Sequence, residues 1–175
     1  MYRDVVKVAQ SQYRYSMVHP SLRLLYVFGS LCKDLSKTIM DFRGFNGSDF
    51  RVRMYSDLTF GVVLYAVTTK TYLDLRQRGF KVSAVRYEDL AASPRDMCRV
   101  ILEHCGLPVS LAEHAVKAFN VDSHRSSIAA KKIIGKFKEP QLTARAKAKS
   151  NELLKRYGAP LIGEPCTVEG TLTSS

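Results

Sequence analysis

Four short stretches of the sequence carry residues that suit the binding of an anion. In the first, Arg3 and Ser11 stand eight positions apart, with a helix-like stretch between them. A guanidinium group binds a terminal phosphate through two parallel hydrogen bonds, and a serine hydroxyl adds one more donor. If the helix leans over the end of a preceding strand, both side chains can reach the same phosphate.

The second stretch, VRYEDL, contains Tyr87 at the end of a predicted strand. Ligands of open α/β sheets bind at the carboxyl ends of the strands, where Tyr87 would offer a ring face and a hydroxyl to a base. The structural alternative is that Tyr87 packs inside the protein. Glu88 and Asp89 would then only favour the start of a helix.

The third and fourth stretches are predicted loops. Residues 122–127 read DSHRSS, and residues 131–138 read KKIIGKFK, with basic residues on both sides of a glycine. A basic segment around a flexible glycine can surround a phosphate. The structural alternative for each is an ordinary solvated loop.

Other kinds of site are not indicated by the sequence. The four histidines lack the spacing of metal ligands and have no nucleophile beside them in the chain, and the four cysteines form no CxxC pair. Neither GxxxxGK(S/T) nor GxGxxG is present. The sequence therefore predicts no metal site and no catalytic residue.

The charge of the chain favours an anionic partner. The 175 residues carry a formal net charge of +11, and the 46% of hydrophobic residues suffices for one domain with a core. A phosphate, a sulfate, a nucleic acid or an acidic membrane would suit this charge. Nucleic acid is disfavoured because Phe137 and Tyr157 stand too far apart for a stacking platform. No apolar run reaches the roughly 18 residues of a membrane span.

The hydrophobic periodicity predicts a mostly helical chain. Apolar residues recur with a helical period at residues 4–17, 21–42, 58–78, 93–105, 110–119 and 143–157. The stretch FKVSAVRY, residues 80–87, alternates and predicts a strand of about eight residues, with a second strand end at residues 1–3. Residues 164–175 are polar and predict a flexible, frayed tail.

A lone strand cannot form a sheet, and two explanations are open. The domain is almost entirely helical and the strand prediction is wrong, or the chain is part of an α/β domain whose other strands lie before Met1. An opening that runs from a strand end through a turn into a helix favours the second explanation.

The order of these stretches resembles the sulfotransferase family that uses 3′-phosphoadenosine-5′-phosphosulfate (PAPS). Residues 3–11, RDVVKVAQS, resemble the family pattern R-x-x-x-D-V-x-x-S in its Arg-to-Ser spacing. Residues 85–108, VRYEDLAASPRDMCRVILEHCGLP, resemble the family strand that ends in YEDL and leads through a helix to GLP. DSHRSS is similar to the DSQ-type loop of the carbohydrate-like and invertebrate branch. Residues 131–140 are similar to the RKGxxGDWK loop that closes over the nucleotide.

The resemblance implies a role for five residues. Arg3 and Ser11 would bind the 3′-phosphate of PAPS, and Tyr87 would contact the adenine side. Ser123 would lie near the nucleoside, and Lys131 near the 3′-phosphate. The expected partners are PAPS or adenosine 3′,5′-bisphosphate and an acceptor hydroxyl, in a carbohydrate or a small molecule.

The resemblance also implies the fold class, an α/β P-loop-like sulfotransferase fold with a parallel sheet flanked by helices. Residues 1–163 would form its C-terminal part, mostly helical with one or two short strands, followed by the flexible tail at 164–175. Full-length members of the family would be located either in a Golgi membrane or in the cytoplasm, and the sequence does not distinguish between these two locations.

In the family, a phosphate loop of the type PKSGTTW and a catalytic His or Glu precede the Arg/Ser motif, and this sequence contains neither before Arg3. We therefore expect the chain to retain the 3′-phosphate half of the cofactor site. It would lack the half that holds the transferred sulfuryl group. The alternative is a non-catalytic nucleotide-binding or anion-binding helical module.

Overall fold

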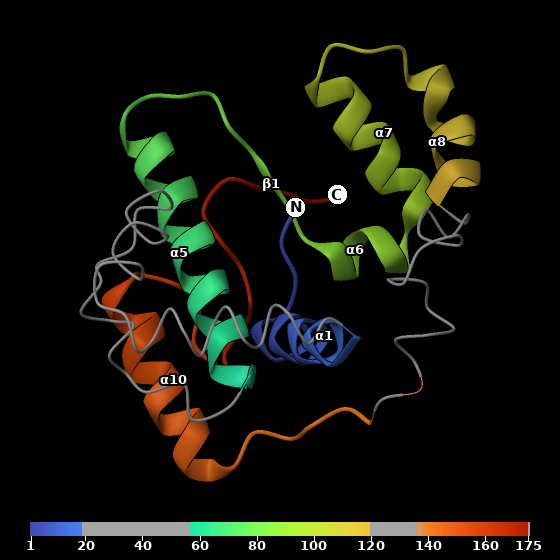
Figure 1. Ribbon diagram of the computed structural model, residues 1–175. Helices are drawn as coiled ribbons and strands as arrows, with labels where there is room; N and C mark the ends of the chain where they lie inside the picture. Colours follow the sequence, from blue (N-terminus) through green and yellow to red (C-terminus); the bar gives the residue numbers. More distant parts are fainter. Residues whose placement is uncertain (19–56, 120–135, 137, 175) are drawn as a thin grey trace.

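The structure is a computed structural model that describes residues 1–18, 57–119, 136 and 138–174 (Figure 1). Most of these residues are helical, and two short strands pair in parallel. The helices are α1 (Val5–Val18), α5 (Asp57–Gln77), α6 (Tyr87–Ala92), α7 (Pro94–His104), the 3-10 helix η1 (Val109–Leu111), α8 (Ala112–Phe119) and α10 (Ala144–Arg156). The strands are β1 (Ala84–Val85) and β2 (Thr171–Leu172). The predicted mixture of many helices with one or two short strands is confirmed, whereas the helix expected at 21–42 lies outside the described residues.

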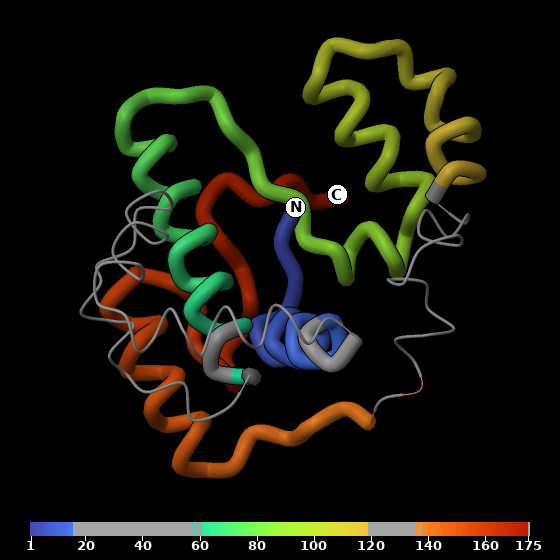
Figure 2. Tube along the Cα trace, in the orientation of Figure 1, coloured from blue at the N-terminus to red at the C-terminus, as the bar shows by residue number. Residues whose placement is uncertain are grey.

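Three segments that are far apart in the sequence run side by side at β1 (Figure 2). On one side, β2 pairs with β1 in parallel, with Ala84 opposite Thr171. On the other side, Tyr2 forms a parallel bridge with Arg86. β1 therefore lies between them, because successive residues of a strand direct their backbone groups to opposite sides.

The Tyr2 bridge consists of two backbone hydrogen bonds. The Tyr2 N–H donates to the Val85 oxygen, and the Tyr87 N–H donates to the Tyr2 oxygen, each over 2.8 Å. Residues 1–3 thus supply a short parallel neighbour for β1, as the strand end expected there requires. Because the pairing is parallel, both segments leave the sheet in the same direction, into α1 and α6.

The strand is much shorter than the predicted range 80–87. Only Ala84 and Val85 belong to β1, and Tyr87 is already the first residue of α6. Phe80 is 57% exposed. In the described part of the chain β2 extends over only two residues, so residues 80–83 have no neighbouring strand with which to form a ladder. The alternation of apolar and polar residues predicts which face of a sheet each side chain would occupy. The length of the strand depends instead on how many residues of a neighbouring strand pair with it.

The C-terminal segment, residues 164–174, differs from the expected flexible tail. Val168 is buried, and the Tyr72 hydroxyl donates to the Glu169 oxygen over 2.8 Å. The Arg76 guanidinium lies 3.3 Å from a Glu169 carboxylate oxygen, and the Tyr2 hydroxyl lies 2.9 Å from Thr171 Oγ1. This polar segment is held because its backbone pairs with β1 and its side chains find partners on α5 and the N-terminal residues.

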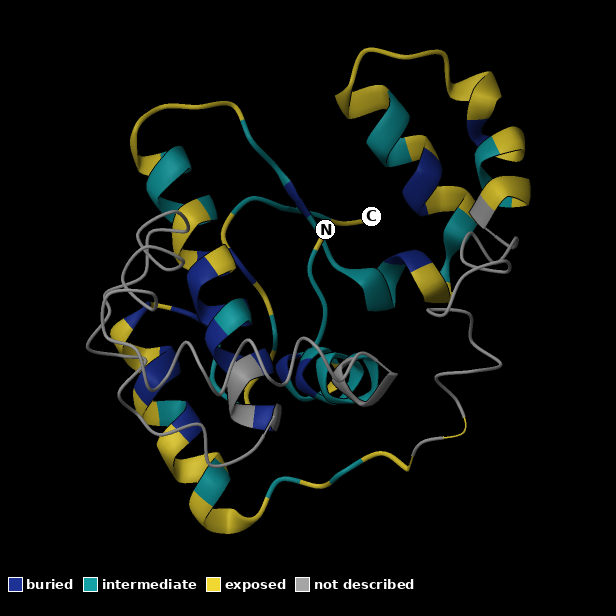
Figure 3. Cartoon of the chain, viewed as in Figure 1, coloured by how far each residue is buried: buried dark blue, intermediate teal, exposed yellow. Residues whose placement is uncertain are grey.

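The main core lies where α1, α5 and α10 face one another, as the dark blue positions in Figure 3 show. A second, smaller core joins α6, α7 and α8 around Met97 and Leu90. The main core consists of Val5, Ala9, Leu58, Val62, Val63, Tyr65, Ala66, Val67, Leu153, Leu154, Tyr157 and Ala159. None of the described helices combines the length and the apolar character needed to cross a lipid bilayer.

The predicted helix starts at residues 143 and 110 differ in how the first turn is capped. Thr143 caps α10, because its hydroxyl oxygen accepts a hydrogen bond from the Ala146 N–H over 3.2 Å. Ser110, the first residue of the predicted helix 110–119, lies inside η1, two residues before α8 begins. A 3-10 turn at a helix start is common, and it moves the cap position without moving the helix.

α1 and α5 approach closely at Gly61, which sets the geometry of the main core. A methyl group added at Gly61 would lie 2.5 Å from Ala9 Cα and 3.2 Å from Ala9 Cβ. The nearest atom is backbone, so it cannot move aside as a flexible side chain could. The two helices can therefore pack at this distance only while residue 61 has no side chain.

We expect Gly61→Ala to lower the free energy of unfolding by about 1–2 kcal/mol. Overpacking of a core costs about 1–3 kcal/mol, and the higher helix propensity of alanine returns at most about 1 kcal/mol. Chemical denaturation followed by circular dichroism measures the change. The matched control is Thr71→Ala on the exposed side of the same helix, for which we expect a change within about 0.5 kcal/mol. Equal stability of the two variants would contradict the close approach.

Candidate functional site

Arg3 and Tyr87 lie together where the two parallel segments leave the sheet. Each residue directly follows a residue of the Tyr2–Arg86 bridge, so the parallel register brings them to the same edge. The Arg3 guanidinium carbon lies 4.7 Å from the centre of the Tyr87 ring. This distance is within the range of a cation–π contact. The structure therefore brings together two of the residues that the sequence singled out.

Glu88 is the third member of this cluster, and its carboxylate faces Arg3. Glu88 Oε1 lies 3.6 Å from Arg3 Nε and accepts a hydrogen bond from the Asp4 N–H over 3.3 Å. The side chains of Arg3 and Glu88 are 38% and 28% exposed. Among the described residues, no hydrogen-bond partner exists for the buried atoms Arg3 Nε and Glu88 Oε2. The two groups attract each other but leave hydrogen-bonding capacity unused.

Two neighbouring charged residues, Asp4 and Arg86, form hydrogen bonds with other partners. The Asp4 carboxylate caps α1, since Oδ1 accepts hydrogen bonds from the Val6 N–H at 2.9 Å and the Lys7 N–H at 3.1 Å. Arg86 Nε donates to Asp89 Oδ1 over 3.0 Å. This hydrogen bond raises the pKa of Arg86 above its ordinary value, despite partial desolvation. Arg3 is therefore the cation of this cluster that is held most loosely.

Ser11 lies on α1, about two turns after the start of the helix, and is half-buried. Its helix also holds the end of the basic segment 131–140. Gln10 Nε2 donates to the Pro140 oxygen over 3.1 Å, and Arg14 Nη1 lies 3.0 Å from a Glu139 carboxylate oxygen. The segment that resembles the closing loop of the family is thus attached to α1 on both sides of Ser11 in the sequence.

Two of the predicted site residues, Ser123 and Lys131, lie outside the described residues. Glu88, Gln10 and Arg14 are contacts that the sequence reading missed. Glu88 stood inside the quoted YEDL block, but its placement against Arg3 follows from the strand register. Gln10 and Arg14 are separated by one helical turn, which is the only sequence signal that they share a face.

A Ser–His contact occurs between Ser83 and His104, whose Oγ and Nε2 atoms are 2.8 Å apart. The sequence did not indicate it, because the two residues are distant in the chain. A nucleophilic serine needs a base that a third group orients. In the described part of the chain no carboxylate contacts His104, and the pair is exposed. The contact therefore links the loop before β1 to the end of α7 and supports no catalytic role.

The thiol next to Arg3 is not a reactive one. Cys166 Sγ lies 3.7 Å from the Arg3 backbone oxygen and 3.2 Å from the Tyr65 hydroxyl. Burial raises the pKa of Tyr65 and of Cys166 above their ordinary values. Both groups are therefore protonated near neutral pH, and a protonated thiol is a poor nucleophile.

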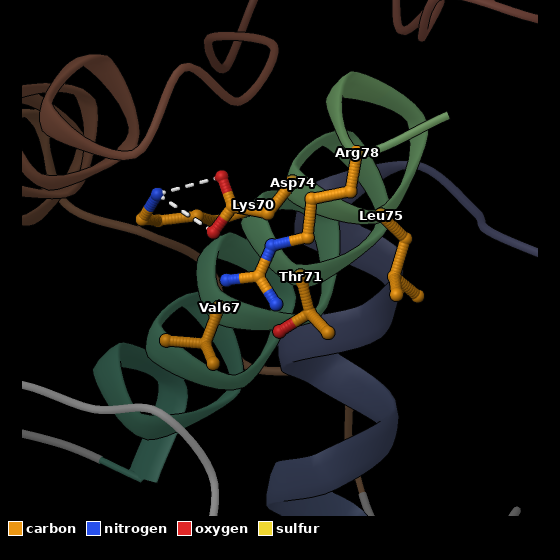
Figure 4. Close-up of a pocket in the computed structure, with 6 residues that line it drawn as sticks. All are labelled: Val67, Lys70, Thr71, Asp74, Leu75 and Arg78. Atoms are coloured by element: carbon orange, nitrogen blue, oxygen red, sulfur yellow. Dashed lines mark hydrogen bonds and ion pairs between the residues drawn. The ribbon is translucent and has the colours of Figure 1, made fainter. Parts of the chain in front are cut away.

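A shallow pocket of about 130 Å³ lies on the outer side of α5 (Figure 4). Lys70 Nζ there contacts both Asp74 carboxylate oxygens over 2.9 Å. Pockets for drug-sized ligands usually have about 300–1,000 Å³, so this one is too small for a nucleotide. It contains none of the predicted site residues and is lined by Val67, Lys70, Thr71, Asp74, Leu75 and Arg78.

Within the described ranges, no three His, Cys, Asp or Glu side chains come together as metal ligands. Comparisons with protein-family models, with curated proteins and with solved structures found no match for this chain. The candidate site is therefore defined by Arg3, Tyr87 and Glu88 at the strand ends, with Ser11 on the adjoining helix.

The Asp4 cap connects the site to the start of α1, and we expect Asp4→Ala to lower the free energy of unfolding by about 1 kcal/mol. The variant leaves the Val6 and Lys7 N–H groups without their acceptor. Asp4→Asn is the matched control, since its amide oxygen keeps an acceptor and is expected to retain most of the stability. Urea denaturation measures both variants, and equal loss in both would contradict a capping role.

Proposed function

We propose that this chain belongs to a PAPS-dependent sulfotransferase with a P-loop-like α/β fold, and that its candidate site binds the 3′-phosphate end of the cofactor. The parent reaction transfers a sulfuryl group from PAPS to a hydroxyl of a carbohydrate or a small molecule. The observation that carries the proposal is the contact between Arg3 and Tyr87 across two parallel segments, at the edge where nucleotide ligands of α/β sheets bind.

The residues present fit the 3′-phosphate half of the cofactor. Arg3 has an unused buried N–H and a guanidinium that is only weakly held by Glu88, so it can donate to a phosphate. Arg3 also covers one face of the Tyr87 ring, so the adenine contact would use another part of that side chain. Ser11 would add a hydroxyl donor from α1.

The attachment of residues 138–140 to α1 gives further support. Gln10 and Arg14 hold Pro140 and Glu139 next to the helix that carries Ser11. In the family, the segment that residues 131–140 resemble closes over the nucleotide, and the end of this segment lies here beside the helix that carries Ser11. Lys131 would approach the 3′-phosphate from this segment.

Sulfuryl transfer resembles phosphoryl transfer, in which positioning and charge stabilisation supply most of the catalysis. The part of this reaction that the chain supplies is cofactor binding and orientation. We assign no described residue of the candidate site as the base for the acceptor hydroxyl: Arg3 is a cation, and the Glu88 carboxylate faces it.

We expect Arg3→Ala to weaken the binding of adenosine 3′,5′-bisphosphate by about tenfold to a hundredfold, because a charge-assisted hydrogen-bond pair is lost. Isothermal titration calorimetry measures the dissociation constant. Arg99→Ala on the exposed surface of α7 removes the same formal charge and serves as the control, with an expected change within about twofold because screening weakens distant charges. Equal effects of both variants would contradict a specific site, and absence of binding by the unmodified chain would reject the proposal.

We expect no turnover above background when this chain alone is given PAPS and a broad set of hydroxyl acceptors. The sequence contains no PKSGTTW-like loop to hold the transferring group and no assigned base. Loss of such groups costs orders of magnitude in rate each. Release of adenosine 3′,5′-bisphosphate, followed by chromatography, measures turnover. Robust product formation would show that other residues of this chain hold the sulfuryl group.

A further inference from the structure

The ring of Tyr87 lies against the guanidinium group that the candidate site offers to an anion. The Arg3 guanidinium carbon is 4.7 Å from the centre of the ring, so the two side chains form a cation–π contact within the protein. Arg3 covers one face of the ring, and a base cannot stack on that face. The sequence predicted a contact between Tyr87 and adenine, whereas the structure gives the ring a cation as its neighbour.

The backbone fixes the points from which these two side chains start. The Tyr87 N–H donates to the Tyr2 oxygen over 2.8 Å, and Arg3 directly follows Tyr2. The relative position of the Arg3 and Tyr87 backbones is therefore set by the parallel bridge. A tyrosine side chain has fewer rotatable bonds than an arginine side chain and loses less entropy when it is held in place. The ring can therefore serve as the rigid support for the guanidinium group.

Glu88 attracts Arg3 but constrains its direction only weakly. The distance between Arg3 Nε and Glu88 Oε1 is 3.6 Å, which is longer than a hydrogen bond. Arg3 Nε accordingly lacks a hydrogen-bond partner among the described residues. An exposed ion pair without a hydrogen bond gains little from any one geometry. The contact with Tyr87 is therefore the stronger constraint on where the guanidinium group lies.

We propose that Tyr87 acts on the cofactor mainly through Arg3, as a positioning residue that holds the guanidinium group ready for the 3′-phosphate. This inference rests on the proposed 3′-phosphate site. Ordering a flexible side chain costs free energy when a ligand binds, and a side chain that is already held in place avoids part of this cost. The ring attracts the positive charge without occupying the N–H donors as a carboxylate would, so the donors stay available to a phosphate.

The test compares two ligands that differ in the base. They are adenosine 3′,5′-bisphosphate and the 3,5-bisphosphate of 1-O-methylribose, which keeps both phosphates and has no base. Each is titrated calorimetrically into the full chain, unmodified or with one substitution. We expect Tyr87→Leu to weaken the binding of both ligands by the same factor, about threefold to fivefold. Tyr87→Phe keeps the ring and its cation–π contact, so we expect a change within about twofold for either ligand.

A double-mutant cycle tests whether Tyr87 acts through Arg3. When Arg3 is already alanine, we expect Tyr87→Leu to leave the affinity for adenosine 3′,5′-bisphosphate unchanged, because the group that Tyr87 positions is gone. Phe80→Leu is the matched control, since it removes an exposed ring from the loop before β1, and we expect it to change neither affinity. If Tyr87→Leu loses its helical circular dichroism spectrum, Tyr87→Met repeats both measurements with an unbranched side chain.

Equal weakening of both ligands in Tyr87→Leu, together with its disappearance in the Arg3→Ala background, supports the proposal. If Tyr87→Leu weakens only the ligand that has a base, or acts as strongly in the Arg3→Ala background, Tyr87 does not work through Arg3. If Tyr87→Leu changes neither affinity, or Phe80→Leu lowers both as much, the positioning role is also rejected. In each of these cases the 3′-phosphate site stands if Arg3→Ala weakens binding. If neither ligand binds to the unmodified chain, both the site and the role of Tyr87 are rejected.

Discussion

Two backbone hydrogen bonds hold Tyr2 beside β1, and the arrangement of the whole candidate site depends on them. They set the register in which Arg3 leaves the sheet next to Tyr87 and Glu88. A shift by one residue would send the Arg3 side chain to the opposite face. The same bridge places the start of α1 beside the start of α6, so the cap at Asp4 and the carboxylate of Glu88 become neighbours. The site is thus a consequence of strand pairing.

The electrostatics of the molecule act on two scales. The chain has a net charge of +11, and exposed lysines occur along α10 at positions 147, 149 and 155. Such a field raises the local concentration of anions over the surface without choosing among them. At the candidate site the charge of Arg3 is partly compensated by the Glu88 carboxylate, which lies 3.6 Å from Arg3 Nε. The field over the surface and the local charge balance at Arg3 therefore arise from different residues.

The helices were predictable because their signals are local. The apolar period identified α1, α5 and α10 within one or two residues, and Thr143 marked the start of α10 through its own hydroxyl. The strands were less predictable. The length of β1 depends on how many residues of β2 face it, and β2 lies more than eighty residues further along the chain in a polar segment. No local pattern in that segment indicates that its backbone completes a sheet.

By itself, the sequence determined α1, α5 and α10, and it singled out Arg3 and Tyr87 as the groups best suited to an anion and a base. Residue chemistry and short-range periodicity suffice for such statements. Only the tertiary structure decided that Glu88 opposes Arg3 and that α1 holds Pro140. Both are contacts between residues distant in the chain, and their existence depends on strand register and helix packing. These are collective properties of the folded chain, and no single stretch of sequence encodes them.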